Sequence, residues 1–126
     1  MEGKYEKLAN LIFPDITETI EDLEKKYPER NLKEGAEVTR YAPSPTGFLH
    51  TGALFTSLIN KKIADQTGGV FYLRLEDTDT KREVEGSAKD VLDGLEAYGL
   101  TPEEGLRKDG TGIGNYGPYR QSEREK

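Results

Sequence analysis

The sequence predicts an α/β fold in which parallel strands are joined by crossover helices, preceded by a helical extension over residues 1–36. Two observations indicate this class. From Glu37 onward, a strand pattern, a helix pattern, a second strand pattern and a second helix pattern follow one another, an order typical of a parallel sheet. Residues 1–36 show only helical spacing and end in a linker, residues 28–35. We therefore expect two domains, 1–36 and 37–126.

The extension is expected to contain two short amphipathic helices, because its apolar residues recur at helical spacing. Pro14 separates the two stretches, and Asp15 is a candidate cap for the second helix. We expect this pair to pack against something larger rather than to carry a site. The apolar positions that define the helices are Tyr5, Leu8, Ile12, Ile16, Ile20, Leu23 and Tyr27.

The second domain begins with a strand over 37–42 and a polar loop over 43–49. A helix is expected over 50–66, with apolar residues at positions 54, 55, 58, 59 and 63 on one face, and the glycine pair at 68 and 69 ends it. Alternation predicts a strand over 70–76. A second helix, 83–99, has Val84, Ala88, Val91, Leu92, Leu95 and Tyr98 on its apolar side.

Beyond Gly99 the chain is rich in glycine and charge and shows no strong period. Two strands are too few for a stable open sheet. Residues 116–126 have the character of an approach to another element, so we expect the chain to be a fragment.

Composition excludes several classes of protein. The net charge is −6 at pH 7, which argues against a basic nucleic-acid grip within this part of the chain. The absence of cysteine excludes disulfides, a thiolate zinc site and a cysteine nucleophile. No apolar run approaches the roughly 18 residues of a membrane span, and the charged start, Met1 to Asn10, has no secretory apolar region. We expect a cytoplasmic protein with no membrane partner.

The strongest candidate site is the strand–loop–helix unit from Arg40 to Gly52. Ligands of parallel sheets bind beyond the carboxyl ends of the strands, and a helix N-terminus there suits phosphate. Gly47 and Gly52 would let a nucleotide approach the backbone. His50, the only histidine, can donate to a phosphate or can simply cap the helix. The unit is neither a Walker loop nor a dinucleotide fingerprint.

The second candidate is the run from Arg74 to Asp79. Glu76, at the end of its strand, can hold an ammonium group, while Arg40 on the neighbouring strand can hold a carboxylate. Together they describe an amino-acid site. The alternatives are that Arg40 and Glu76 pair with each other or with Arg74, and that Thr78 or Asp79 caps a turn. We rank a cap above a Mg²⁺ site for these acids and predict no protein-held metal.

A third stretch, Tyr116 to Arg124, predicts a tight turn and a polar segment with little chemistry of its own. The three stretches contain Arg-x-Ala-Pro-Ser-Pro-Thr-Gly-x-Leu-His, Gly-Gly-x-Phe-x-Leu-Arg-Leu-Glu-Asp-Thr-Asp and Tyr-Gly-Pro-Tyr-x-Gln-Ser-Glu-Arg. In this order and spacing they resemble the glutamyl-tRNA synthetases, a class I aminoacyl-tRNA synthetase family. The resemblance covers residues 37–126 and implies the first half of a Rossmann-like catalytic domain.

The resemblance also implies roles for individual residues. Arg40 matches the arginine that pairs with the side-chain carboxylate of glutamate, and Glu76 matches the acid that holds the amino group. His50 and Gly52 match the first and third positions of the His-Ile-Gly-His-type motif that binds ATP. Thr51 and Ala53 depart from the family's usual second and fourth positions. The expected glutamate pocket also includes Ala42 and Ser44, and the expected ATP site consists of Thr46, Gly47, His50 and Gly52.

The implied reaction joins L-glutamate to ATP, with Mg²⁺ on the phosphates, and then transfers the glutamyl group to tRNA. The Lys-Met-Ser-Lys-Ser motif and the anticodon-binding region are expected beyond Lys126, so most tRNA contacts should lie there and this piece alone should have little activity. Three alternatives remain open. A glutaminyl-tRNA synthetase tends to have Asp-Asp-Thr-Asn in the second stretch, and a glutamyl-queuosine tRNA(Asp) synthetase has Glu-Asp-Ile-Asp. A non-catalytic binding module is the third.

Overall fold

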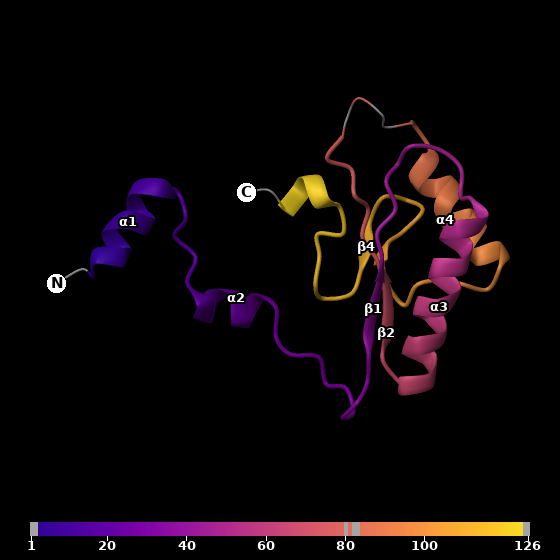
Figure 1. Cartoon of the computed structure of the whole chain (residues 1–126), viewed down its shortest axis with the longest axis horizontal. Helices are drawn as coiled ribbons and strands as arrows, with labels where there is room; N and C mark the ends of the chain where they lie inside the picture. Colours follow the sequence, from indigo (N-terminus) through magenta and orange to yellow (C-terminus); the bar gives the residue numbers. More distant parts are fainter. Residues whose placement is uncertain (1–2, 80, 82–83, 125–126) are drawn as a thin grey trace. The chain divides into compact units, whose positions relative to one another are not determined.

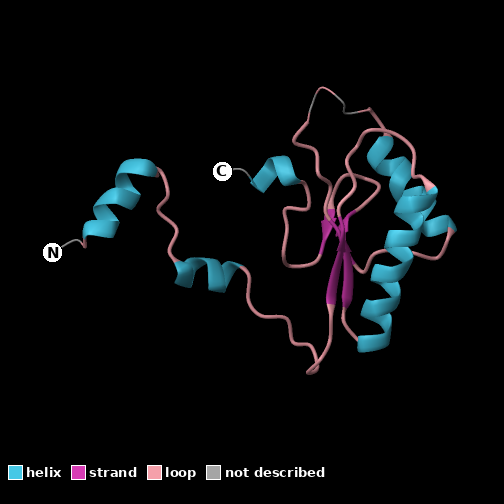
Figure 2. Cartoon of the chain, viewed as in Figure 1, coloured by secondary structure: helices cyan, strands magenta, loops and turns pink. Residues whose placement is uncertain are grey.

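The computed structural model describes residues 3–79, 81 and 84–124. The chain forms two compact units, Met1–Arg30 and Asn31–Lys126, and each is described by itself. Figure 1 traces the chain from its indigo start to its yellow end, and Figure 2 shows that all strands belong to the second unit. Within the described residues, no helix combines the length and the apolar character needed to span a membrane.

The first unit contains two short helices, α1 (Lys4–Ile12) and α2 (Ile20–Lys26). Helix α2 begins later than predicted, and its cap is Thr19 rather than Asp15. The hydroxyl of Thr19 accepts from the backbone N–H of Asp22 at 3.2 Å, and the Asp22 carboxylate accepts from the Thr19 N–H at 3.0 Å. This reciprocal pair satisfies two N–H groups that a helix start leaves without partners, which Asp15 alone cannot do.

The second unit contains a four-stranded sheet in the order β1-β2-β3-β4. The pair β1–β2 is parallel, as the sequence predicted, and two strands that it did not predict follow: β3 is parallel to β2, and β4 is antiparallel to β3. Strands β3 and β4 were missed because runs of three and two residues are too short to show a period. The elements are β1 (Val38–Tyr41), α3 (Thr51–Thr67), β2 (Val70–Leu73), α4 (Ser87–Ala97), β3 (Glu104–Leu106), β4 (Gly112–Ile113) and the 3₁₀ turn η1 (Gln121–Arg124).

Helix α3 turns its small residues inward. Ala53, Ser57 and Ala64 are buried, whereas Phe55 is 63% exposed. The predicted apolar face is therefore not the buried face: Leu54 is partly buried, but Leu58, Ile59 and Ile63 are exposed like Phe55. Small side chains let a helix approach its neighbours closely, so the buried face contributes close packing rather than large apolar area.

A glycine pair joins α3 to β2, as the sequence predicted. Gly68 ends α3 with φ 69°, in the left-handed region, and donates to carbonyls of the last turn. A Cβ on Gly69 would lie 1.8 Å from the carbonyl oxygen of Glu37. Only glycine allows this close passage, which brings the start of β2 beside the start of β1 (Figure 1).

Helix α4 and the sheet enclose the main core. The helix is shorter than predicted: Tyr98 is 68% exposed and Val84 51% exposed, and Glu83, the predicted first residue, lies outside the described residues. One core member, Tyr119, comes from the stretch for which sequence indicated only a turn. The buried apolar cluster consists of Leu73, Leu75, Val91, Leu92, Leu95, Leu100, Leu106 and Tyr119.

Candidate functional site

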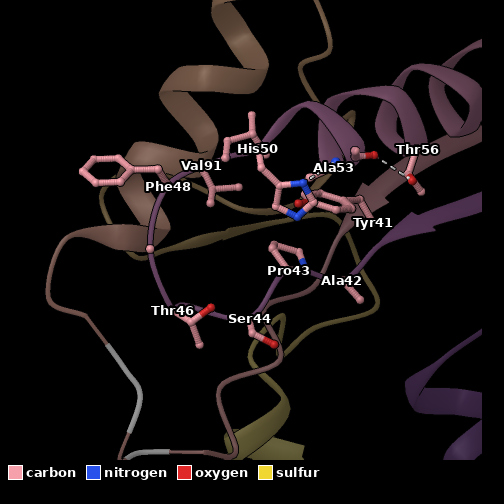
Figure 3. A pocket seen from close by; sticks show the side chains of 13 residues that line it. Tyr41, Ala42, Pro43, Ser44, Thr46, Phe48, His50, Ala53, Thr56 and Val91 are labelled. Carbon is pink, nitrogen blue, oxygen red and sulfur yellow. Dashed lines mark hydrogen bonds between the residues drawn. The ribbon is translucent and has the colours of Figure 1, made fainter.

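The loop between β1 and α3 lines a cavity of about 500 Å³ at the carboxyl end of β1. Figure 3 shows its lining side chains around the start of α3. The lining includes every predicted residue of the first stretch except Arg40. Burial raises the pKa of the Tyr41 hydroxyl in this lining. The lining residues are Tyr41, Ala42, Pro43, Ser44, Thr46, Gly47, Phe48, Leu49, His50, Gly52, Ala53, Thr56 and Val91.

His50 is the N-cap of α3. Its Nδ1 accepts from the backbone N–H of Ala53 at 3.3 Å. A neutral imidazole that accepts at Nδ1 carries its proton on Nε2, which leaves Nε2 as a donor. Figure 3 places the ring in the cavity lining. The two interpretations of His50, cap and ligand donor, are therefore compatible, because they use different ring nitrogens.

Gly52 leaves room for the imidazole. A Cβ at this position would lie 3.1 Å from Cε1 of His50, so any side chain would press on the ring. The Gly52 carbonyl accepts from Oγ1 of Thr56 at 3.0 Å, the dashed bond in Figure 3. Ala53, at a position where the resembled family more commonly has a polar residue or glycine, is 8% exposed, so its methyl group is packed.

Arg40 and Glu76 form an ion pair, with 3.2 Å between Nη1 and Oε1. Arg74 adds a longer contact, 3.6 Å from Nη2 to the same carboxylate oxygen. The alternative that these groups pair with one another is thus confirmed for the chain alone. Neither Arg40 nor Glu76 lines the cavity, but the backbone N–H of Glu76 donates to the carbonyl of Pro43 at 2.8 Å. The ion pair therefore lies beside the loop that forms the cavity.

Sequence reasoning missed Asp77, which is 5% exposed. Its carboxylate accepts from the N–H of Ser122 at 2.9 Å, from the Ser122 hydroxyl at 2.8 Å and from Arg120 Nη1 at 3.4 Å. Burial raises the pKa of this carboxyl, but the hydrogen bonds from Ser122 and Arg120 together lower it more, so its pKa lies below the ordinary value.

The third stretch is consequently more than a turn. Leu75 donates its N–H to the carbonyl of Tyr119 at 3.0 Å and accepts from the N–H of Gln121 at 2.8 Å. The sequence offered one sign of this contact between Asp77 and the third stretch: the chain contains both a polar Asp-Thr-Asp run and a polar Gln-Ser-Glu-Arg run. Composition alone does not show that these two runs meet.

The described residues contain no cluster of three or more histidine, aspartate or glutamate side chains that could hold a metal ion. The cavity lining contains no carboxylate at all. What the site offers chemically is a helix N-terminus, a histidine donor and an adjacent pair of opposite charges.

Comparisons with known proteins agree with the three motifs. Residues 37–126 match the family described as "tRNA synthetases class I (E and Q), catalytic domain". The chain is 56% identical to a glutamate–tRNA ligase of Clostridium perfringens (strain 13 / Type A) over 120 residues, 95% of this chain and 22% of that protein. A glutamate–tRNA ligase of Acetivibrio thermocellus is 49% identical over 121 residues, with the same coverage.

A solved structure shows the same fold. The glutamate–tRNA synthetase of Elizabethkingia anophelis superposes with a TM-score of 0.65 at 46% identity, covering 71% of this chain and 17% of that one. The chain thus spans about a fifth of the length of the relatives it matches.

Proposed function

This chain belongs to the catalytic-domain family of the class I tRNA synthetases for glutamate and glutamine, and we propose that it is part of a glutamate–tRNA ligase. In the proposed reaction, the α-carboxylate of L-glutamate attacks the α-phosphate of ATP and releases pyrophosphate. The terminal ribose hydroxyl of tRNA(Glu) then takes the glutamyl group. The observation that carries this proposal is the Arg40–Glu76 pair beside a cavity that a helix N-terminus borders.

The charged pair supplies the proposed amino-acid site. The side-chain carboxylate of glutamate would bind Arg40 in a bidentate manner, and its ammonium group would bind Glu76. Both side chains are already partly desolvated, at 38% and 31% exposure. In the chain alone, Arg40 pairs with a carboxylate and Glu76 pairs with a cation. Glutamate carries both kinds of group, so its carboxylate can take the place of Glu76 at Arg40 and its ammonium group can take the place of Arg40 at Glu76. Ala42 and Ser44, which line the adjoining cavity, would border this amino-acid site.

The cavity supplies the proposed ATP site. The first backbone N–H groups of a helix have no partner within it, and they carry the positive end of the helix dipole. Nε2 of His50 adds a donor, and Gly47, Gly52 and Thr46 line the approach. Because the lining has no carboxylate, this part of the chain does not fit a protein-held Mg²⁺. We expect the metal to be held by the ATP phosphates, where it neutralises their charge.

Neither chemical step needs a protein nucleophile. The proposed residues act by aligning the glutamate carboxylate with the α-phosphate and by donating to the phosphate oxygens as charge develops on them. Since the chain spans only about a fifth of its relatives, we expect the 126 residues alone to have little or no activity.

The test is aminoacylation by the full-length protein with labelled glutamate, offered tRNA(Glu), tRNA(Gln) and tRNA(Asp) separately. We expect label on tRNA(Glu). Label only on tRNA(Asp) would assign the protein to the queuosine-modifying relatives, and no label on any tRNA from a folded protein would leave a non-catalytic binding module. Arg40→Gln should abolish charging, whereas Arg107→Gln, at an exposed arginine outside the cavity lining, is the matched control.

A further inference from the structure

Residues 74–76 directly follow β2 (Val70–Leu73), and this segment, the strand end, is held on both of its sides. On one side, Arg74 donates its backbone N–H to the carbonyl of Tyr41 at 3.1 Å, and Glu76 donates to that of Pro43 at 2.8 Å. These bonds attach residues 74–76 to the loop that lines the cavity. The backbone alternates, so the groups of Leu75 point the other way.

On that other side lies the third stretch, to which the proposed chemistry gives no role. Leu75 bonds through both its N–H and its carbonyl to Tyr119 and Gln121, in a parallel bridge with Arg120. Tyr119 is 5% exposed and belongs to the core. Residues 119–121 thus pair through a single parallel bridge with the segment that carries Glu76.

Asp77 completes this attachment. Its carboxylate receives three donors, two from Ser122 and one from Arg120, across 45 residues of sequence. A carboxylate that is 95% removed from solvent is costly unless it is paired. The strand end and the third stretch are therefore coupled: separating them would leave a buried charge and two backbone groups of Leu75 without partners.

We propose that Asp77 is a positioning residue for the amino-acid site: by latching residues 120–122 beside the strand end, it fixes the adjacent Glu76 where it meets Arg40. This inference rests on the proposed function, which assigns Glu76 to the substrate ammonium group. Asp77 itself touches no substrate. Its effect passes through the backbone of Glu76, whose N–H is already anchored to Pro43.

We call the attachment between the strand end and the third stretch the latch. The latch should act on glutamate and spare ATP. None of its residues lines the cavity proposed for ATP, which is built from the β1–α3 loop, the start of α3 and Val91. The latch residues are Leu75, Asp77, Tyr119, Arg120, Gln121 and Ser122. A loosened strand end would let the Glu76 carboxylate leave the 3.2 Å geometry with Arg40. We therefore expect loss of the latch to raise the KM for glutamate and to leave the KM for ATP unchanged.

The experiment uses glutamate-dependent ATP–pyrophosphate exchange by the full-length protein with tRNA(Glu) present, while the concentrations of glutamate and ATP are varied in turn. For Asp77→Ala we expect the KM for glutamate to rise about tenfold while the KM for ATP stays within about twofold of wild type. Asp77→Asn should rescue part of the effect, because its amide oxygen still accepts from the Ser122 N–H. Glu103→Gln is the matched control: this carboxylate accepts from the N–H of Phe71 at 3.0 Å, at the opposite end of β2.

Backbone hydrogen exchange gives a second readout that does not depend on the reaction. The Leu75 and Gln121 amides should lose at least about tenfold protection in Asp77→Ala and keep it in Glu103→Gln. Unchanged protection, or equal rises in both Michaelis constants, would overturn the inference. Should Asp77→Ala fail to fold, Ser122→Ala, which removes the hydroxyl that donates to Asp77 at 2.8 Å, carries the same test. Absence of exchange activity in the folded wild type would instead overturn the proposed function, while amide protection would still decide whether the latch exists.

Discussion

The two ring nitrogens of His50 have separable roles, and substitutions can divide them. Nδ1 caps α3 by accepting from Ala53, whereas Nε2 is the donor proposed for a phosphate. Asparagine at position 50 places an oxygen where Nδ1 lies and removes the distal donor. Glutamine keeps a distal N–H and gives up the cap, and alanine removes both groups.

The magnitudes follow from these contacts. Loss of an N-cap costs about 1 kcal/mol of local stability, and the 3.3 Å distance of the His50 bond places it at the weaker end. Loss of one donor to a developing oxyanion costs about 100-fold in kcat. We therefore expect His50→Asn to lose about 100-fold in kcat while the start of α3 stays intact. His50→Ala should show both losses, and His50→Gln should recover part of the rate.

The assay combines ATP–pyrophosphate exchange by the full-length protein, with tRNA(Glu) present, with hydrogen exchange at the Ala53 amide. The Ala53 N–H also donates to the His50 backbone carbonyl at 3.0 Å, a bond that all three variants keep, so its protection should fall only in part in His50→Ala and should persist in His50→Asn. A kcat of His50→Asn within about twofold of wild type would refute the donor role. Unchanged protection of the amide in His50→Ala would refute the cap.

Three further outcomes are expected. Gly69→Ala should destabilise the full-length protein by about 2 kcal/mol in a urea titration, since its methyl would lie 1.8 Å from the Glu37 carbonyl oxygen, whereas Gly3→Ala, with nothing nearer than 3.8 Å, should lose only the smaller N-cap preference for glycine at the start of α1; equal midpoints would contradict the close approach. Arg40→Lys keeps the positive charge but cannot bind a carboxylate in a bidentate manner, so kcat/KM for glutamate should fall about 100-fold with the KM for ATP unchanged. A similar rise in the KM for ATP would count against Arg40 as a glutamate ligand. The pKa of the Asp77 carboxyl is lowered on folding, so its stabilisation is complete above its unfolded-state pKa and is lost as pH falls through its folded-state pKa. The difference in unfolding temperature between wild type and Asp77→Asn should be constant above about pH 5 and should shrink below about pH 4. A difference that does not change with pH would be evidence against this account.

Much of the second unit was predictable because its signals are local. The alternation that predicted a strand over 70–76, of which residues 70–73 form β2, and the apolar spacing of α4 each depend on residues close together in the chain. Helix α3 ends at Gly68 because the backbone there turns left-handed, which glycine adopts without strain. A glycine at a helix end is visible from a single position of the sequence. His50 at the helix start was visible for the same reason, as was its ambiguity between cap and donor.

The features that the sequence did not predict depend on contacts between segments that are distant in the chain. Residues 104–106 form a strand because β2 offers them a partner, and their own three-residue pattern is too short to predict it. Helix α3 presents large apolar residues over much of its surface, so periodicity alone did not reveal that Ala53, Ser57 and Ala64 are buried. Which face is buried depends on how close a neighbouring element can approach.

The sequence by itself determined the order of strands and helices from residue 37 to residue 99 and the family, because caps, periods and the three motifs are written in neighbouring residues. Only the tertiary structure decided that Arg40 meets Glu76 and that Asp77 meets Ser122, pairs separated by 36 and 45 residues. A residue type states what a side chain can bind. Its partner is chosen by the fold, since burial and parallel pairing bring distant segments to one edge of the sheet.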